Sequence, residues 1–345
     1  MQARHTRVRI TYDNKDISED LAPFLDSFDF KDNADGAADD ISITLEDRQE
    51  LWESDWFPSK GATLKASIIF TNWNNAEGDV EVPLGLFEVD EIEISGLPHK
   101  VRIKAVSVPS NNELRGVKKN RAWEKVKLSA IAKEIADRAG LGLYLNLRED
   151  NEIERLEQKE ESDLAFLTRV AKDKGYGVKV SDSQLDVYYI PDLDNLDPVS
   201  TIKKAASRIT SYSFKSRTRD IYKACHVRYE NAKKGQLVEF TFTDPNKTEG
   251  QTLEIHKQVA DVAEAEKLAR GELREKNKDE FTGRLSFGGM ADKTGNGFIF
   301  MAGLTVQIED FHEFDGKYLI TGSSHRVSNS GYSCDIDIRR CLNGY

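Results

Sequence analysis

The chain has 345 residues and an acidic balance, with 60 Asp and Glu against 49 Lys and Arg and a formal net charge of −11. This length exceeds what one compact core usually organises, so two or three domains are expected. Because contacts with phosphates need basic patches, the charge argues against nucleic-acid binding as the main role, and we expect no specific nucleic-acid partner.

Targeting and redox signals are sparse. No apolar run approaches the roughly 20 residues that span a bilayer, and residues 1–12 lack the apolar core of a signal peptide. We therefore expect no membrane insertion and no signal peptide. The three cysteines, Cys225, Cys334 and Cys341, are odd in number and far apart, which predicts reduced thiols in a protein made in the cytosol.

Residues 1–112 have the pattern of a first β domain. Apolar and polar residues alternate in short runs separated by turn signals, which is typical of a small barrel or sandwich. The runs lie at 7–12, 40–46, 62–70, 86–95 and 100–106, and the last two predict a hairpin around Gly96-Leu-Pro98. The link that holds Trp52, Trp56 and Phe57 is predicted to be a short helix that plugs the core rather than a platform for a ligand.

Residues 113–192 have the pattern of a compact α/β module. An apolar stripe from Leu128 to Ala139, ended by Gly140, predicts a helix, although Lys127 stands where a Ser or Thr cap is expected. Residues 141–147 then predict a strand. This order of elements is also similar to that of LysM-type peptidoglycan binders, although the hairpin that follows does not fit them.

A second helix in this module has both ends marked. Ser162 is a suitable N-cap, because its hydroxyl can accept from free amides of the first turn, and Asp163 complements the helix dipole. Leu167 belongs to the apolar stripe, and Gly175 can take the left-handed conformation that ends a helix. The alternating residues 176–189 predict a hairpin that turns at 181–183.

Residues 193–345 predict a second β domain that contains one helix. The segment from Pro191 to Pro198 is polar with a proline at each end, so it is expected to be a loop or domain boundary. Asp261 and Glu264 form a capping box for a helix that runs to Lys276. Strands are predicted at 209–215, 224–229, 236–243, 282–288, 305–309, 317–321 and 331–339. The fold class is therefore expected to be mainly β with an α+β insertion.

No constellation of catalytic or metal-binding residues is evident. The six histidines are scattered, and no cysteine pair has the spacing of a zinc site. Cys225 and His226 are neighbours on a predicted strand, so their side chains face opposite ways. Glu160 and Glu161 precede a helix cap and are expected to be solvated, and the glycines between 283 and 303 are expected to mark turns. We predict no enzymatic activity, no metal and no cofactor.

Three regions carry motifs in a defined order: Gly85-Leu-Phe-Glu-Val-Asp-Glu-Ile-Glu-Ile with Lys100-Val-Arg-Ile-Lys-Ala, then Arg121-Ala-Trp with Gln158 to Gly175, then Ala302-Gly-Leu-Thr-Val with Phe314 to Thr321, His325 and Ser330-Gly-Tyr-Ser-Cys-Asp-Ile. Together they resemble phage late control protein D and related tail baseplate hub proteins of contractile phage tails, phage-tail-like bacteriocins and type VI secretion spikes. The residues that match the family's motifs, called the motif residues below, are Trp123, Gln158, Ser162, Asp163, Phe166, Leu167, Arg169, Gly175, Gly303, Asp315, Gly316, His325 and Gly331.

The resemblance implies a structural role. Two β-barrel tube domains would flank the α/β module, and three chains would form a ring of six similar barrels that adapts a sixfold tail tube to a threefold spike. The implied partners are two further copies of the chain in a homotrimer, a tail spike protein, a tail tube protein, a tape measure protein and baseplate wedge proteins. The implied location is the baseplate of a virion or tail-like particle, after synthesis in the bacterial cytoplasm.

With no spike or lysozyme segment after Tyr345, the chain resembles the short hub form that recruits a separate spike.

The sequence is also compatible with other functions. A phage-associated peptidoglycan-binding protein or hydrolase is one alternative, and a hexameric distal tube protein of related fold is another.

Overall fold

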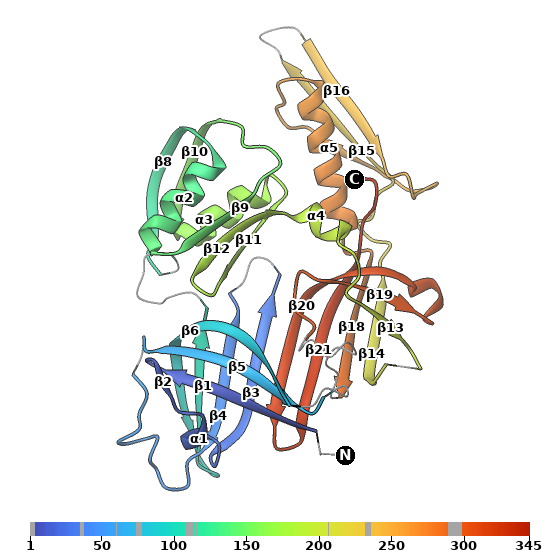
Figure 1. Cartoon of the computed structure of the whole chain (residues 1–345). Coiled ribbons are helices and arrows are strands. Elements are labelled where there is room, and N and C mark those ends of the chain that lie inside the picture. Colours follow the sequence, from blue (N-terminus) through green and yellow to red (C-terminus); the bar gives the residue numbers. More distant parts are fainter. Residues whose placement is uncertain are drawn as a thin grey trace.

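The computed structural model describes residues 4–34, 38–59, 61–73, 78–107, 114, 116–205, 207–231, 236–288 and 299–345 (Figure 1). The expected boundary near residue 112 and the glycines from Gly289 to Gly297 lie outside these residues. The first third contains α1 (Ser18–Leu21) and the strands β1 (His5–Tyr12), β2 (Lys15–Asp16), β3 (Leu25–Asn33), β4 (Asp40–Glu46), β5 (Thr63–Thr71), β6 (Asp79–Ser95) and β7 (Lys100–Val106).

The last part of the chain supplies a second group of strands. They are β13 (Ser200–Lys203), β14 (Ile209–Ser216), β18 (Phe281–Gly288), β19 (Thr305–Glu309), β20 (Gly316–Ser328) and β21 (Gly331–Arg340). Among the described residues, both groups belong to one sheet of thirteen strands, in the order β14-β18-β21-β20-β3-β4-β7-β6-β5-β1-β2, with β19 pairing β20 and β13. β3 and β20 join the groups by pairing antiparallel between residues 27–33 and 322–328.

The first group rolls up without closing. β6 pairs with β5 along its first half and with β7 along its second half, with register shifts that bend the sheet. Its far strand, β1, returns to contact β20 and β21 without pairing with them, and Trp73 and Phe70 pack on Tyr332 at this seam. The mainly β prediction is confirmed, but the ladders among the described strands form one shared open sheet and not two closed barrels.

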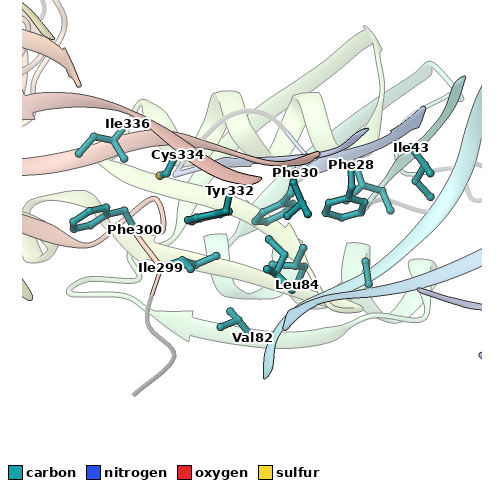
Figure 2. Packing of buried hydrophobic residues seen from close by; sticks show 14 of the residues in the cluster. Phe28, Phe30, Ile43, Val82, Leu84, Ile299, Phe300, Tyr332, Cys334 and Ile336 are labelled. Atoms are coloured by element: carbon teal, nitrogen blue, oxygen red, sulfur yellow. The ribbon is translucent and has the colours of Figure 1, made fainter. Parts of the chain in front are cut away.

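One hydrophobic core spans both groups of strands. Figure 2 shows Phe28 and Phe30 of β3 in a row with Tyr332 of β21, and Ile299, Phe300 and Val82 of β6 belong to the same cluster. Phe28 and Phe30 are at most 2% exposed, because alternate residues of a strand face the same side of the sheet. The shared core ties the beginning and end of the chain into one body.

The predicted helix at the aromatic link is wrong, because residues 52–56 form turns. Trp52 is buried in the core, as expected of a plug. Trp56 and Phe57 are 43% and 48% exposed. The link is anchored by Asp47, whose side chain accepts from the backbone amides of Leu51 and Trp52.

The middle module has two layers. It contains β8 (Lys119–Val126), α2 (Leu128–Ala139), β9 (Gly142–Asn146), β10 (Ile153–Glu161), α3 (Asp163–Lys172), β11 (Tyr176–Ser181) and β12 (Gln184–Tyr189). The helices pack on the sheet β11-β12-β9, and β8 pairs with β10 beside them. The predicted helices, strand and hairpin are confirmed, and the hairpin turns at Asp182 and Ser183, both with positive φ. The ladder of β8 and β10 was not predicted.

A separate α/β unit interrupts the second group of strands. It contains β15 (Ala224–Asn231), β16 (Gln236–Thr243), β17 (Thr252–Ile255) and α5 (Val262–Asn277), and it has its own core. β15 and β16 were expected with the other strands of the second β domain, but they form a sheet of their own with β17. The local pattern is the same in either sheet, and the apolar face of α5 decides between them by covering β15 and β16 (Figure 1).

Two further local predictions are wrong. The expected loop after residue 190 begins with the short helix α4 (Ile190–Asn195), with Pro191 in its first turn, where proline needs no amide partner. Gly283 and Gly288 lie in β18 rather than in turns, and a Cβ at Gly283 would come within 2.7 Å of the Phe214 ring. Among the described residues, none of the helices is both long and apolar enough to cross a membrane.

Candidate functional site

The ends of α3 are built as expected from the motif residues. Ser162 has an extended backbone, and its hydroxyl accepts from the Ala165 amide at 3.3 Å, so it is the N-cap. Gly175 has a φ of 80° and is the last residue of the turn between α3, which ends at Lys172, and β11. Leu167 and Phe166 are both fully buried. The sequence pattern placed Leu167 in the core, whereas Phe166 lies beside the stripe and is buried by packing outside the helix.

The buried carboxylate of Asp163 is the centre of the middle module's polar contacts. Its side chain is 3% exposed, and it pairs with Lys119 Nζ at 2.8 Å and Arg138 Nη1 at 2.9 Å. Gln158 Nε2 donates to Asp163 Oδ1 at 3.0 Å and to the Glu161 carbonyl at 3.1 Å. These contacts join β8, α2, β10 and α3 at one point, so Gln158 and Asp163 hold the module together.

A stacked aromatic pair lies beside this centre. The rings of Trp123 on β8 and Phe166 on α3 are stacked with centroids 5.8 Å apart, and both are buried. The Arg121 guanidinium covers the Trp123 ring at 3.6 Å and pairs with Glu134 of α2. This arrangement explains why Arg121-Ala-Trp and Phe166 occur together in one module.

Arg169 connects α3 back to β10. Its guanidinium pairs with Glu161 and donates to the Glu157 carbonyl at 2.9 Å. The Glu161 side chain is only 20% exposed because of this pairing, so the expectation that it is solvated is wrong. Glu160 is exposed, as expected.

α2 is capped by a residue outside its own sequence. Lys127 makes no side-chain cap, as its identity suggested. Instead the Asp150 carboxylate, from the loop after β9, accepts from the Ser129 amide at 3.1 Å. The free amide at the start of α2 is therefore satisfied by a tertiary contact.

The motif residues of the last part shape loops. Gly303, Gly316 and Gly331 have φ of 89°, 142° and 107°. Asp315 Oδ1 accepts from the Phe311 amide at 2.7 Å. Arg340 Nη2 donates to the Asp315 carbonyl at 3.2 Å, so the loop before β20 is tied to the end of β21. Substituting any of these glycines would force another residue into the left-handed region.

His325 of β20 lies inside the shared core. It is 1% exposed and stacks between Phe30 of β3 and Tyr332 of β21. Its Nδ1 lies 2.8 Å from the Tyr332 hydroxyl and its Nε2 lies 3.0 Å from the Ser323 hydroxyl. Burial lowers the pKa of His325 to about 4, so the neutral ring acts as a packed hydrogen-bonding residue where the two groups of strands meet.

A buried charge group next to His325 was missed by the sequence analysis. Lys179 of β11 pairs with Asp32 of β3 and lies 3.3 Å from Asp39 Oδ2, and both carboxylates are at most 5% exposed. Asp32 Oδ2 also accepts from the Ala302 amide at 2.7 Å. Burial raises the pKa of Asp39 to about 7; the Asp32 carboxylate adds to the rise and the Lys179 ammonium opposes it. The group joins the middle module to both groups of strands.

A second buried charge group, also missed, joins α4 and α5 to the large sheet (Figure 1). Asp194 of α4 is 1% exposed and pairs with Arg274 of α5 and with Arg339 of β21, whose Nη1 lies 2.9 Å from Asp194 Oδ1. Asp194 lies in a polar segment that was expected to be a loop, so its burial was not predicted. The three residues come from positions far apart in sequence, so no local spacing could have identified them.

The described residues contain no cluster of three or more His, Cys, Asp or Glu residues able to hold a metal. All three cysteines are free and buried, and burial raises the pKa of Cys225 to about 11 and of Cys341 to about 12. Cys225 is buried and His226 faces away from it toward Thr241. The contacts of Asp163, Lys179 and Asp194 each join several elements of the fold.

Comparison with known families agrees with this architecture. Residues 99–331 match the model of the phage tail baseplate hub (GPD) family. The chain belongs to the phage tail baseplate hub family. The matched range contains all of the motif residues, β20 and both α/β units, whereas β1 to β6 lie outside it.

Curated hub proteins are similar over part of their length. The chain is 32% identical over 174 residues to the probable baseplate hub protein of Escherichia phage P2, and 29% identical over 177 residues to that of Escherichia phage 186. Each match covers about half of this chain, 50% and 51%, but only 42% and 43% of the relative.

Solved structures share the fold of this hub-family member. A tail protein from Neisseria meningitidis MC58 superposes with a TM-score of 0.70 at 14% identity, covering 97% of both chains. The 43 kDa tail protein of prophage MuSo2 from Shewanella oneidensis gives 0.70 at 13% identity, covering 97% of this chain and 98% of that one. A type VI secretion component from E. coli gives 0.56 at 12% identity, covering 93% of this chain and 75% of its own.

Proposed function

We propose that the chain is the central baseplate hub of a contractile tail or related injection machine. Its membership of the hub family carries this proposal. In this role three copies form a ring that adapts a sixfold tail tube to a threefold spike. The protein acts as an assembly part and performs no enzymatic chemistry.

The shared sheet gives this role a physical basis. Each chain holds two groups of strands in one sheet and one core. If each group forms one tube domain, three copies present six tube domains, and the mismatch between sixfold and threefold partners disappears. In this proposal residues 1–112 and 193–345 are the tube domains, residues 113–192 are the middle module, and β15 to α5 are an outer unit inserted in the second tube domain.

The proposed partners follow from the place of a hub in a tail. They are a spike protein on one face, a tail tube protein on the other, and tape measure and baseplate wedge proteins around them. The Francisella PdpA-VgrG complex contains a chain of this fold, with a TM-score of 0.59 at 9% identity. The proposed location is the baseplate of a virion or tail-like particle.

The proposal is tested by counting copies. Native mass spectrometry of the protein assembled with its spike, or reconstruction of the particle, should show three copies of the chain in one ring. Six copies in the ring would identify a hexameric distal tube protein instead. A dye-release assay on purified peptidoglycan should give no activity, and release above a heat-inactivated control would favour a hydrolase.

A further inference from the structure

One end of the molecule carries an exposed apolar patch within an acidic segment. We call this surface the acidic patch. Its apolar centre consists of the exposed Trp56 and Phe57 of the aromatic link and of Leu97 in the turn between β6 and β7, which is 84% exposed. Acidic side chains surround this centre. The link and the hairpin are in contact, because the Asp47 amide donates to the His99 carbonyl at 3.0 Å and His99 lies 3.8 Å from Glu53.

The charge of this patch is one-sided. Residues 46–55 contain five acidic residues and one arginine. Glu50, Glu53 and Asp55 are exposed there, and α1 adds the exposed Glu19 and Asp20 close to Phe24, whose ring contacts Trp56. A surface of this kind fits a partner with exposed aromatic groups and a basic rim.

A complementary surface occurs on the same chain. Residues 200–219 contain six Lys and Arg and no acidic residue, although the whole chain is acidic. Of these, Lys215, Arg208 and Arg217 are exposed along and beside β14, and Tyr212 on this strand is 46% exposed. We define this segment as the basic edge.

The basic edge is also an open strand edge. Among the described strands, β14 ends the order of the large sheet and pairs only with β18. The backbone amides and carbonyls on its outer side can pair with a strand of another chain. Such an open edge promotes aggregation unless a partner covers it. The stretch therefore offers backbone, aromatic and positively charged groups together.

The two surfaces lie at opposite sides of the molecule. In Figure 1 the link between β4 and β5 is at the lower left, and β14 is at the lower right. They cannot meet within one copy, but the patch of one copy can meet the edge of another in a head-to-tail contact. Such a contact is heterologous, and it closes into a ring when the rotation between copies allows it.

We propose that the acidic patch of one copy binds the basic edge of the next, and that this contact closes the hub ring. The proposal rests on the proposed ring function and names the surfaces that build it. Opposite charge steers the copies together and fixes their orientation, and Trp56, Phe57 and Tyr212 supply the apolar area. The acidic patch and the basic edge of one copy cannot contact each other, because they lie at opposite sides of the molecule.

Charge reversal tests the contact in the full-length protein. Glu50→Lys with Asp55→Lys should weaken self-association by roughly tenfold or more, and so should Lys215→Glu with Arg217→Glu. Sedimentation velocity over a range of concentrations measures the change. The matched control, Glu152→Lys with Glu154→Lys, reverses two exposed acidic residues in the middle module and should leave association unchanged.

Recombining the reversals separates this contact from general charge effects. A chain that carries all four substitutions regains opposite charges across the contact and should again form trimers. A mixture of the two double variants should form pairs, but an odd ring of three leaves one mismatched contact, so it should not close. If the fourfold variant stays as weak as the double variants, or if neither double variant differs from wild type, the proposal is wrong.

Crosslinking tests the same contact and can detect it even when the copies associate only weakly. Asp55→Cys with Lys215→Cys should crosslink between copies through a short bismaleimide, because the three native cysteines are buried. Glu154→Cys with Lys215→Cys is the control and should not crosslink. A particle with three hub copies but no crosslink between positions 55 and 215 would overturn this interface and leave the hub function standing. Loss of duplex DNA binding in Lys215→Glu with Arg217→Glu, with association unchanged, would assign the basic edge to nucleic acid instead.

Discussion

At the scale of single residues, buried carboxylates hold the connections that the fold depends on. Asp163 collects one lysine, one arginine and one amide from neighbouring elements, and Asp32 with Asp39 surrounds Lys179. A buried charge that is paired and hydrogen-bonded is tolerated, whereas the same charge without partners is costly. Removing such a carboxylate should therefore have larger effects than removing an exposed one.

Asp163→Ala should lower the free energy of unfolding by about 3 kcal/mol, the lower end of the range for breaking a buried pair. The lower end applies because the side chains of Lys119 and Arg138 are 18% and 30% exposed and can reach water. Urea denaturation measures the change. Asp137→Ala, which removes an exposed pair with Lys133 on α2, is the control and should change stability by under about 1 kcal/mol. Equal effects of the two substitutions would contradict this account.

Asp39 should make stability depend on pH. Its folded-state pKa of about 7 lies above that of an unfolded aspartate, near 3.9, so the folded state binds more protons between these values. The stability of wild type relative to Asp39→Asn should therefore fall as pH rises from about 4 to about 7, by at most about 1.4 kcal/mol per pH unit. Thermal or urea melts of both proteins across this range measure it.

His325 changes stability with pH in the opposite direction to Asp39. Its contribution is present in both wild type and Asp39→Asn, so it cancels when the two proteins are compared. Its folded-state pKa of about 4 lies below the usual 6.5, so its contribution to stability is lost as pH falls through this range. Both proteins contain His325 and Lys179, so the difference between them isolates Asp39. Parallel pH profiles for wild type and Asp39→Asn would show that the Asp39 carboxyl titrates normally.

At the scale of elements, α3 is specified by its own sequence to an unusual degree. Its cap, its stripe and the glycine that follows it all occur within residues 162–175. Ser162 caps the helix, and Gly175 takes its positive φ in the turn after the helix ends at Lys172. α2 contrasts with it, because its cap comes from Asp150, in a loop that follows the helix by a full strand. Local sequence signals therefore predict the start of α3 but not the start of α2.

Substitutions in α3 should separate its cap from its packing. Ser162→Ala should cost roughly 1 kcal/mol through loss of the N-cap, and Leu167→Ala or Phe166→Ala should cost roughly 2–5 kcal/mol because both side chains are fully buried. Lys172→Ala, at the exposed end of the helix, should have little effect. Denaturant unfolding of each variant gives these values. An unchanged midpoint for Leu167→Ala would remove this helix from the core.

At the scale of the whole molecule, two buried charge groups set how the parts are arranged. The group around Lys179 attaches the middle module to both groups of strands. The group around Asp194 attaches α4 and α5 to the end of β21. The proposed ring would need each copy to present its surfaces at fixed angles, and buried ion pairs between the parts would help to fix those angles.

Asp194→Ala should destabilise the protein by about 3–5 kcal/mol, because it leaves two buried guanidinium groups without their carboxylate. Hydrogen exchange should become faster in α5 and at the end of β21 before it changes in β3 and β4. Asp192→Ala on the same helix is the control, since it loses only a pair with Arg148, which is 64% exposed, and a hydrogen bond from Asn146. Uniformly faster exchange over the whole chain would argue against a local connection.

Elements whose signals are local could be predicted from the amino-acid sequence alone. Alternation predicted β1, β4, β5 and the long hairpins, because one face of each strand is buried wherever it lies. Caps and glycines predicted α3 and the hairpin after it. The family motifs identified the hub fold, because most of their residues are fixed by contacts within one module.

How these elements combine depends on contacts between residues that are far apart in the sequence. Whether β15 and β16 joined the large sheet or a sheet of their own depended on what α5 covers, and alternation is the same in both cases. The pairing of β3 with β20, which merges two expected barrels into one open sheet, joins residues about 300 positions apart. The roles of Asp32, Asp39 and Asp194 also depend on partners that are remote in sequence. Burial energy and ion pairing act through space, so residues that a local pattern assigns to loops or strand ends can become the points that hold the molecule together.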